Sequence, residues 1–272
     1  MHVAFTKMHG LGNDFLIMEA PAGGVVPSAA QWRHLADRHA GVGFDQALVL
    51  EPPRMAGSAA HYRVFNADGG EVEQCGNGAR CIAYYLQMHG RAGVDGSVSM
   101  DGAGGLVAAR VLDDGRVAVD LGIPDFEPSS LPFATAATEA TYTLAVAGEN
   151  LEFGAVAVGN PHAVVRVTAV ERLGRALQSH PSFPRQVNVG FMQIIDAGHI
   201  RLRVYERGAG ETMACGTGAC AAVAVGRNLG LLGAEVEVHV RGGRLGVHWD
   251  GPGQRIWLAG PTAVAYTGQA EI

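Results

Sequence analysis

Two segments of this chain repeat one pattern of residues, and each is centred on a cysteine. They are residues 65–79, Phe-Asn-Ala-Asp-Gly-Gly-Glu-Val-Glu-Gln-Cys-Gly-Asn-Gly-Ala, and residues 205–219, Tyr-Glu-Arg-Gly-Ala-Gly-Glu-Thr-Met-Ala-Cys-Gly-Thr-Gly-Ala. In both, an aromatic residue lies ten positions before the cysteine, glycine five and glutamate four, and Gly-x-Gly-Ala follows. A duplicated thiol site favours two thiols, Cys75 and Cys215, on opposite sides of one substrate, as a racemase or epimerase needs.

The chemistry of inversion explains why two cysteines suit such a site. The α-hydrogen of an amino acid is a very weak acid, and inverting that carbon requires a base on one face and an acid on the other. The two groups exchange roles in the reverse direction, so two residues of the same type meet the symmetry of the reaction. A free cysteine has a pKa of about 8.5, so that thiol and thiolate are both accessible near neutral pH.

Each cysteine directly precedes the expected N-terminus of a helix. The unpaired backbone N–H groups and the helix dipole at that position favour a thiolate. The N–H groups of residues 76–77 and 216–217 can also bind the α-carboxylate of a substrate, and the glycines there let the backbone approach closely. A carboxylate held in this way stabilises the charge that develops when the α-proton leaves. The two motifs thus predict an acid–base site that needs no cofactor.

The remaining cysteines have simpler interpretations. Cys81 and Cys220 follow the first pair at spacings of Cys-x5-Cys and Cys-x4-Cys, which are not the short hooks of structural zinc sites, so no metal is expected. Both fall inside expected helices and are interpreted as small buried apolar residues. No Gly-x-Gly-x-x-Gly motif follows a strand with an acidic residue downstream, so a nucleotide-binding fold is unsupported.

The elements that must position the thiols can be read from turns, caps and periodicity. Helices are expected at residues 28–41, 79–89, 170–180 and 219–229, the first with Ser28 as its N-cap. Hairpins are expected at residues 106–121, 142–158 and 189–205, with further strands pairing around residues 242–243 and 250–251. Strands joined mostly by tight turns, with few helices between them, indicate an α+β fold with largely antiparallel sheet.

The repeat extends beyond the cysteine motifs and predicts two similar domains. Gly12-Asn13 corresponds to Gly159-Asn160, and Gln46 lies about where Asn188 would fall. The offsets of 147, 142 and 140 residues, the last from Cys75 to Cys215, shrink slightly along the chain, as duplication with changes in loop length would produce. Residues 122–132 contain three prolines and are the best candidate for a linker.

Composition narrows the class of protein. The chain has 272 residues, a formal net charge of −6, and 48% hydrophobic against 17% charged residues. This length favours two domains, and the composition supports a buried core. The lack of a basic stretch argues against nucleic acid as a partner, and no apolar run approaches the roughly 20 residues of a membrane span. Residues 1–7 show no signal-peptide pattern, so we expect reduced thiols in a cytoplasmic protein.

Four segments closely resemble the diaminopimelate epimerase family: residues 5–15, 66–81, 159–162 and 206–220. The resemblance implies an isomerase independent of pyridoxal phosphate and other cofactors, which interconverts LL- and meso-2,6-diaminopimelate for lysine and peptidoglycan synthesis. It also implies a homodimer of chains with two similar domains, each a sheet curled around a central helix, with the active site in the cleft between them. In that fold the last strand returns to the first domain. The expected domains are therefore residues 1–121 with 264–272, and residues 122–263.

The resemblance also implies roles for individual residues. Cys75 and Cys215 match the two acid–base residues of the family, and His162 and Glu206 match the polar neighbours that set thiol protonation. The residues that match substrate contacts are Asn13, Gln46, Asn66, Gly76, Asn77, Asn160, Asn188, Glu206, Arg207, Gly216 and Thr217. Departures are small: Val156-Ala157-Val158 stands where a Ser-Met pair is frequent, and Met213 where leucine is common.

The chemistry of these side chains suits a substrate with two amino-carboxylate ends, as diaminopimelate has. Arg207 can hold a carboxylate with two hydrogen bonds, and Asn66, Asn160 and Asn188 can each donate to a carboxylate and accept from an ammonium group. The thiol pair alone does not separate this enzyme from a proline-type or histidine-type racemase or epimerase. From other classes, a thiol redox protein, a metal-binding protein and a non-catalytic amino-acid-binding module remain alternatives.

Overall fold

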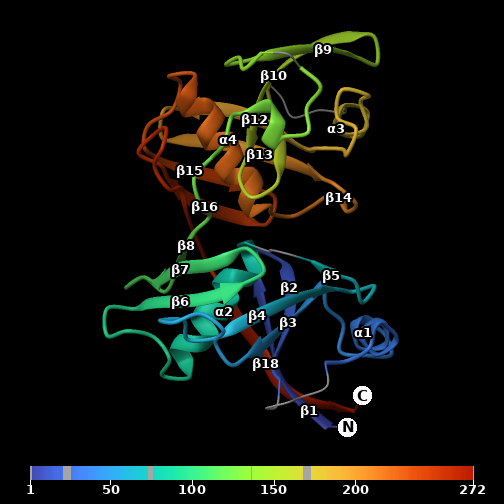
Figure 1. Cartoon of the computed structure of the whole chain (residues 1–272), viewed down its shortest axis with the longest axis vertical. Coiled ribbons are helices and arrows are strands. Elements are labelled where there is room, and N and C mark those ends of the chain that lie inside the picture. Colours follow the sequence, from blue (N-terminus) through green and yellow to red (C-terminus); the bar gives the residue numbers. More distant parts are fainter. Residues whose placement is uncertain (1, 21–25, 73–75, 136, 168–172, 272) are drawn as a thin grey trace. The chain divides into compact units, whose positions relative to one another are not determined.

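The structure is a computed structural model that describes residues 2–20, 26–72, 76–135, 137–167 and 173–271. The chain folds into two compact units, residues 1–119 with 260–272 and residues 120–259 (Figure 1). The boundaries expected from the sequence lie two and four residues further along the chain. Within the described residues, no helix combines the length and the apolar character that crossing a membrane requires.

The first unit is built on a mixed, mostly antiparallel sheet. Its strands pair in the order β18–β1–β2–β3–β4–β6–β7–β8, with β5 added to β4, and the β2–β3 and β4–β6 pairs are parallel. The bounds are β1 His2–Gly10, β2 Asn13–Glu19, β3 Gln46–Glu51, β4 His61–Asn66, β5 Glu71–Val72, β6 Ser97–Gly102, β7 Gly105–Val111, β8 Val117–Asp120 and β18 Ala263–Glu271.

Two helices pack on opposite faces of this sheet. Helix α2 (Gly76–Met88) contacts β1, β2, β6 and β7, so the curled sheet surrounds it. Helix α1 (Ala29–Ala36) places Trp32 against the outer face, in a core that includes Leu16 and Met18. Successive side chains of β2 point to opposite faces of the sheet, and each face is covered by one of the two helices. This position explains why β2 and β3 contain unbroken runs of buried residues.

The second unit has the same plan. Its strands pair in the order β9–β10–β11–β12–β13–β15–β16–β17, with β14 added to β13, and the β11–β12 and β13–β15 pairs are parallel. The strand bounds are β9 Tyr142–Val146, β10 Glu149–Ala157, β11 Pro161–Arg166, β12 Asn188–Asp196, β13 His199–Glu206, β14 Gly210–Glu211, β15 Glu235–Val240, β16 Gly243–His248 and β17 Trp257–Gly260, and the helices are η1 Pro128–Ser130, α3 Gly174–Gln178 and α4 Gly216–Asn228.

The register of the parallel strands relates the two units residue by residue. The β2–β3 pairing starts at Phe15 opposite Gln46, and the β11–β12 pairing starts at His162 opposite Asn188. His162 therefore occupies the position of Phe15, and Asn188 that of Gln46, as the sequence repeat predicts for the latter pair. This repetition confirms the expected α+β fold of two similar units.

The helix boundaries differ from the expected ones for identifiable reasons. Ser28 caps α1 in a capping box with Gln31, as predicted, but Asp37 is extended and ends the helix well before residue 41. Helices α2 and α4 begin at residues 76 and 216, three residues earlier than expected, because the glycines in their first turns have low helix propensity and give no local signal for a helix. A Cβ on Gly218 would lie 2.9 Å from Val204, so tight packing under the sheet requires glycine there. The expected helix at 170–180 is reduced to α3, and residues 170–172 lie outside the described part.

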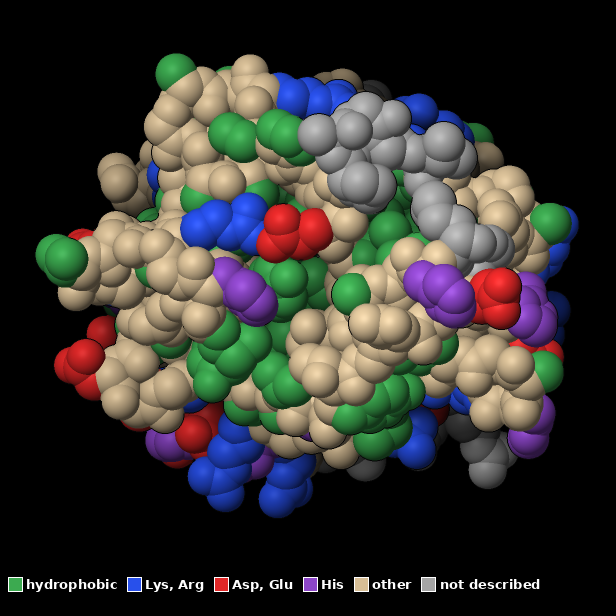
Figure 2. Space-filling view, turned by 90° about the horizontal axis from the view of Figure 1, so that it is seen from below, with side chains coloured by type: hydrophobic (Ala, Val, Ile, Leu, Met, Phe, Trp, Pro, Cys, Tyr) green, Lys and Arg blue, Asp and Glu red, His purple; other side chains and the backbone are tan. Residues whose placement is uncertain are grey.

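The final strand is largely exposed. In β18, Val264 and Tyr266 keep 38% and 47% of their surface accessible. Figure 2 shows hydrophobic side chains reaching the surface across the middle of the face seen from below, with most charged side chains nearer its margin. The homodimer implied by the family resemblance stays a prediction.

Candidate functional site

The expected site residues lie at matched places in the two units, where strands end beside the N-terminus of the long helix. Cys75 lies outside the described residues, and α2 begins directly after it at Gly76. Cys215 is the N-cap of α4, with an extended backbone. The prediction that this cysteine immediately precedes a helix is therefore correct.

Cys215 is buried and faces a carboxylate. Cys215 keeps 4% of its surface exposed. Its Sγ donates a hydrogen bond to Oε2 of Glu206 at 3.1 Å. A second contact, 3.5 Å long, joins Sγ to the hydroxyl oxygen of Thr217 in the first turn of α4. Glu206 is the last residue of β13, so the strand end and the helix start bring acid and thiol together.

Burial decides the protonation of this thiol. Burial raises the pKa of Cys215 well above its ordinary value, and the negative charge of Glu206 raises it further. Hydrogen bonds from Thr217 and the Gly218 backbone act in the opposite direction but do not offset these two effects. The expectation that the helix N-terminus would favour a thiolate is therefore wrong for Cys215, because desolvation disfavours the charged form more strongly. Cys215 is a thiol at neutral pH.

Thr212 holds the other oxygen of the same carboxylate, a contact that motif spacing did not single out. Its hydroxyl donates to Oε1 of Glu206 while Oε2 accepts from Cys215. A carboxylate with both oxygens engaged has one preferred orientation, which keeps the second oxygen aimed at sulfur. The only signal in the sequence was the place of Thr212 directly after the shared glutamate of the repeat.

His162 is a neutral, fully buried imidazole beneath the start of α4. Its Nε2 lies 2.8 Å from Oδ1 of Asn160 and 3.0 Å from the hydroxyl oxygen of Thr217. Because an amide oxygen only accepts, Nε2 carries the hydrogen and donates it to Asn160. Burial, assisted by the positive charge of Arg207, lowers the pKa of His162 to about 3. His162 is thus a neutral hydrogen-bonding group within this unit.

Asn188 connects two strand ends of the second unit through its carboxamide. Its Nδ2 donates to the carbonyl of Pro161 at 3.1 Å, and its Oδ1 accepts from the backbone N–H of Arg207 at 2.8 Å. The guanidinium of Arg207 donates to the Arg185 carbonyl at 3.1 Å, and the residue is exposed. Asn188 therefore fixes the backbone that carries Arg207, whose charged end reaches the surface.

In the first unit the expected polar residues form two contacting pairs. Asn77, in the first turn of α2, donates from Nδ2 to Oδ1 of Asn13 at 3.2 Å. Gln46 and Asn66 are register partners at the ends of β3 and β4, and Nε2 of Gln46 donates to Oδ1 of Asn66 at 2.9 Å. The structure thus brings Asn13 to Asn77, in the first turn of α2, and Gln46 to Asn66, across the β3–β4 pair.

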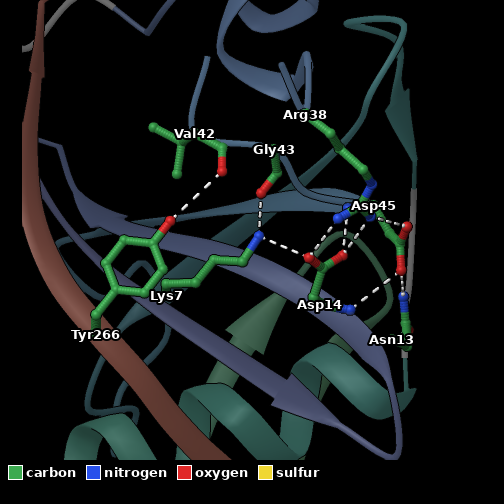
Figure 3. A network of polar contacts seen from close by, with 8 residues as sticks. All are labelled: Lys7, Asn13, Asp14, Arg38, Val42, Gly43, Asp45 and Tyr266. Carbon is green, nitrogen blue, oxygen red and sulfur yellow. Dashed lines mark hydrogen bonds and ion pairs between the residues drawn. The ribbon is translucent and has the colours of Figure 1, made fainter. Parts of the chain in front are cut away.

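A charged cluster next to Asn13 was not anticipated from the sequence. Asp14 forms ion pairs with Lys7 at 2.7 Å and with Arg38 at 2.8 Å, and Arg38 also contacts Asp45 at 2.8 Å (Figure 3). Burial alone would raise the pKa of Asp14, but hydrogen bonds from Arg38 and Lys7 more than offset this and hold the pKa well below its usual range. The Asn-Asp dipeptide at residues 13–14 was the only local signal for this cluster.

The described residues contain no group of three or more His, Cys, Asp or Glu side chains arranged to hold a metal ion. The chemistry that the second unit presents is proton transfer. A buried thiol donates to a carboxylate that is itself oriented by a hydroxyl, and the backbone of Gly218 in the first turn of α4 hydrogen-bonds to the sulfur. Such a group can deliver its proton to carbon, and the thiolate that remains can take a proton from carbon in the reverse direction.

Comparisons with known proteins agree with this fold. A family model described as diaminopimelate epimerase matches residues 5–127 and 154–271. Similar solved structures include a hydroxyproline epimerase from Agrobacterium vitis with bound trans-4-hydroxy-L-proline, with a TM-score of 0.71 and 18% identity over 99% of this chain and 92% of that chain. A protein from Pseudomonas aeruginosa, described as a predicted epimerase, has a TM-score of 0.68 and 18% identity over 99% of both chains.

A third similar structure is a phenazine biosynthesis protein of the PhzF family from Bacillus anthracis, with a TM-score of 0.69 and 16% identity over 100% of both chains. These likenesses to solved structures show a shared fold. The family match covers both units of this chain, including both cysteine motifs. The chain therefore belongs to the diaminopimelate epimerase family, and it is an isomerase of the amino-acid epimerase and racemase type.

Proposed function

We propose that this protein interconverts LL- and meso-2,6-diaminopimelate by two-base proton transfer between Cys75 and Cys215, without a cofactor, in lysine and peptidoglycan biosynthesis. The observation that carries the proposal is the buried Cys215–Glu206 pair at the start of α4, in a sequence that repeats the same motif around Cys75. The cytoplasmic location and the homodimer expected from the sequence belong to this proposal.

The resting protonation of Cys215 sets the direction of each half-reaction. With its pKa raised by burial and by Glu206, Cys215 starts as the acid, and Cys75 as a thiolate removes the α-proton from the opposite face. The carbanion then takes the proton of Cys215, so that one C–H bond breaks and one forms. In the reverse direction the Cys215 thiolate removes the α-proton and the Cys75 thiol donates its proton to the opposite face, so that the two residues exchange roles. His162 stays neutral and orients Asn160 through its Nε2–H.

The backbone at the two helix ends suits the reacting carboxylate. Gly76 and Asn77 begin α2, and Gly216 and Thr217 begin α4. N–H groups in the first turn of a helix have no partner within the helix, and they bind anions with help from the helix dipole. We propose that these groups hold the α-carboxylate and stabilise the charge that spreads into it as the α-proton leaves.

The other polar residues suit the second amino-carboxylate end of diaminopimelate. Arg207 is exposed and charged, and Asn188 fixes the backbone beneath it. Asn66 and Asn160 add amide groups that can face a carboxylate or an ammonium group. The alternative is a racemase or epimerase of another amino acid on this fold, because a similar structure, the hydroxyproline epimerase, holds trans-4-hydroxy-L-proline.

Solvent exchange at the α-carbon tests the function and the substrate together. The protein is incubated in deuterium oxide, without added cofactor, with LL- and meso-diaminopimelate, L-proline, trans-4-hydroxy-L-proline and L-histidine. We expect deuterium at one α-position of diaminopimelate together with inversion, and none in the other amino acids. Deuterium in proline or hydroxyproline instead would move the assignment to the alternative. Exchange with no amino acid in the panel would contradict the proposed diaminopimelate activity.

A further inference from the structure

A line of hydrogen bonds in the first unit runs from a carboxylate to a guanidinium through two carboxamides. Oδ2 of Asp45 accepts from Nδ2 of Asn13 at 2.9 Å. Oδ1 of Asn13 accepts from Nδ2 of Asn77 at 3.2 Å. Oδ1 of Asn77 accepts from a terminal nitrogen of Arg80 at 3.0 Å. The line joins the segment before β3, the start of β2 and the first turns of α2.

The two charged ends give this line a single direction. A carboxylate only accepts hydrogen bonds and a guanidinium only donates them, whereas a carboxamide can do either with its two ends. The amide nitrogen of Asn13 must therefore face Asp45, which turns its oxygen toward Asn77. The oxygen of Asn77 must in turn face Arg80. Reversing either amide would place two acceptors or two donors against each other.

Both ends of the line are themselves held in place. Arg38 donates to Oδ1 of Asp45 at 2.8 Å, which leaves Oδ2 for Asn13 and for the backbone N–H of Asp14 at 3.1 Å (Figure 3). At the other end, Arg80 is fully buried on α2. A Cβ on Gly10 would lie 3.1 Å from its guanidinium nitrogen, so the guanidinium fills the space that this glycine leaves. Neither charge can move far from its amide.

We propose that Asp45 and Arg80 are positioning residues, which fix the direction of the Asn13 and Asn77 carboxamides so that each presents one defined end to the substrate. This inference rests on the proposed function, together with the family resemblance by which Asn13 and Asn77 match substrate contacts. Asp45 is not among the residues that the family resemblance implies. The charge of Asp45 orients the carboxamide of Asn13. A neutral amide in place of Asp45 could either donate or accept, so the Asn13 carboxamide could then flip by 180°.

Asp45→Asn is the sharpest test, because it keeps the shape of the side chain and removes the charge. Asp45 is exposed, so the variant is expected to fold. We expect kcat/KM to fall about tenfold, the loss for one hydrogen bond of about 1.4 kcal/mol, with a larger rise in KM than fall in kcat. Asp114→Asn is the matched control, because Asp114 is an exposed carboxylate paired with Arg116.

A purely structural role would give a different result. It would lower the melting temperature and the active fraction, so kcat would fall while KM stayed unchanged. Wild-type values of KM and kcat in Asp45→Asn, or equal losses in Asp114→Asn, would overturn the proposal. Asp45→Ala, which removes the acceptor altogether, is expected to raise KM at least as much as Asp45→Asn.

A spectroscopic measurement separates this inference from the proposed function. With 15N-labelled asparagine, the side-chain amide protons of Asn13 are assigned through loss of their signal in Asn13→Ala. In the substrate-free wild type, the Asn13 amide proton that is hydrogen-bonded to the Asp45 carboxylate is expected to exchange slowly with solvent. This protection is expected to disappear in Asp45→Asn. An unprotected Asn13 amide in the wild type would overturn the inference, whichever amino acid the enzyme uses.

Discussion

The two units hold equivalent asparagines by opposite ends. Asn13 gives its amide nitrogen to the carboxylate of Asp45, whereas Asn160 gives its amide oxygen to the imidazole of His162. In the register of the parallel strands, Phe15 takes the place of His162, and the position of Asp45 is filled in the second unit by Val187. The two units thus repeat the same backbone arrangement. Different neighbouring side chains make Asn13 a hydrogen-bond donor to Asp45 and Asn160 an acceptor from His162.

The same asymmetry extends to the thiols. Glu206 lies nine residues before Cys215, and a neutral Asn66 lies nine residues before Cys75. In the second unit this position places a carboxylate against the cysteine, and that carboxylate raises the pKa of the thiol. A duplication with identical surroundings would give both cysteines the same resting protonation. Two-base inversion needs one acid and one base at rest, so this difference between the repeats serves the reaction.

The largest expected effect comes from removing either thiol. Cys75→Ala and Cys215→Ala should each lower kcat/KM for epimerisation by about a thousandfold or more. Each substitution removes the acid–base group from one face of the α-carbon. The measurement is inversion of LL-diaminopimelate followed by chiral chromatography. Cys220→Ala is the control, since Cys220 is buried within α4, and its activity per folded molecule should be unchanged. Near-full turnover in either test variant would reject the two-base scheme.

Glu206→Gln tests whether the carboxylate creates the difference between the thiols. The variant removes the negative charge that raises the pKa of Cys215, so this pKa should fall toward its ordinary value. The pH midpoint for alkylation of Cys215 by iodoacetamide, followed by mass spectrometry, should therefore move to lower pH, and kcat should fall about a hundredfold. An alkylation profile identical to that of the wild type would show that Glu206 does not control this thiol.

Thr212→Val removes the hydroxyl that orients Glu206 while keeping the shape of the side chain. We expect kcat to fall about tenfold, the loss for one hydrogen bond to a charged group, because the carboxylate can rotate away from Cys215. Thr212→Ser retains the hydroxyl and should recover most of the activity. Full activity in Thr212→Val together with a loss in Thr212→Ser would show that the methyl packing of Thr212 matters and its hydroxyl does not.

The smallest effect concerns the charged cluster of the first unit. The pKa of Asp14 is held below its ordinary value of 3.8 in the folded protein, so ionised Asp14 stabilises the fold at neutral pH. That contribution is complete above the unfolded pKa and is lost as pH falls through the folded pKa. Asp14→Asn should therefore lower the free energy of unfolding at pH 7 more than at pH 3, measured by urea denaturation.

The exposed Asp113 supplies the control for that measurement. Asp113→Asn should change the free energy of unfolding equally little at both pH values, because the side chain lies on the surface of the β7–β8 turn. If the free energy of unfolding changes between pH 7 and pH 3 by the same amount in Asp14→Asn as in the wild type, groups other than Asp14 cause the acid sensitivity. Both variants can be compared by the same two-state analysis of the urea curves.

Much of the frame was predictable from local signals. The N-cap at Ser28 and the turns of the β9–β10, β12–β13 and β15–β16 hairpins were all expected from short stretches of sequence. These features depend on residues close together in the chain, so sequence alone contains them. Helix starts at Gly76 and Gly216 were missed, because glycine disfavours helix locally and is required here only by strands that pack across it.

The sequence by itself determined the duplicated fold and the place of Cys215 directly before a helix, because these follow from motif spacing and repetition. Only the tertiary structure decided the electrostatics. The high pKa of Cys215, the neutral His162 and the direction of the Asn13 and Asn77 amides depend on burial and on charges brought together from distant strands and helices. Desolvation and hydrogen-bond direction are properties of the folded surroundings, and no spacing of residues along the chain specifies them.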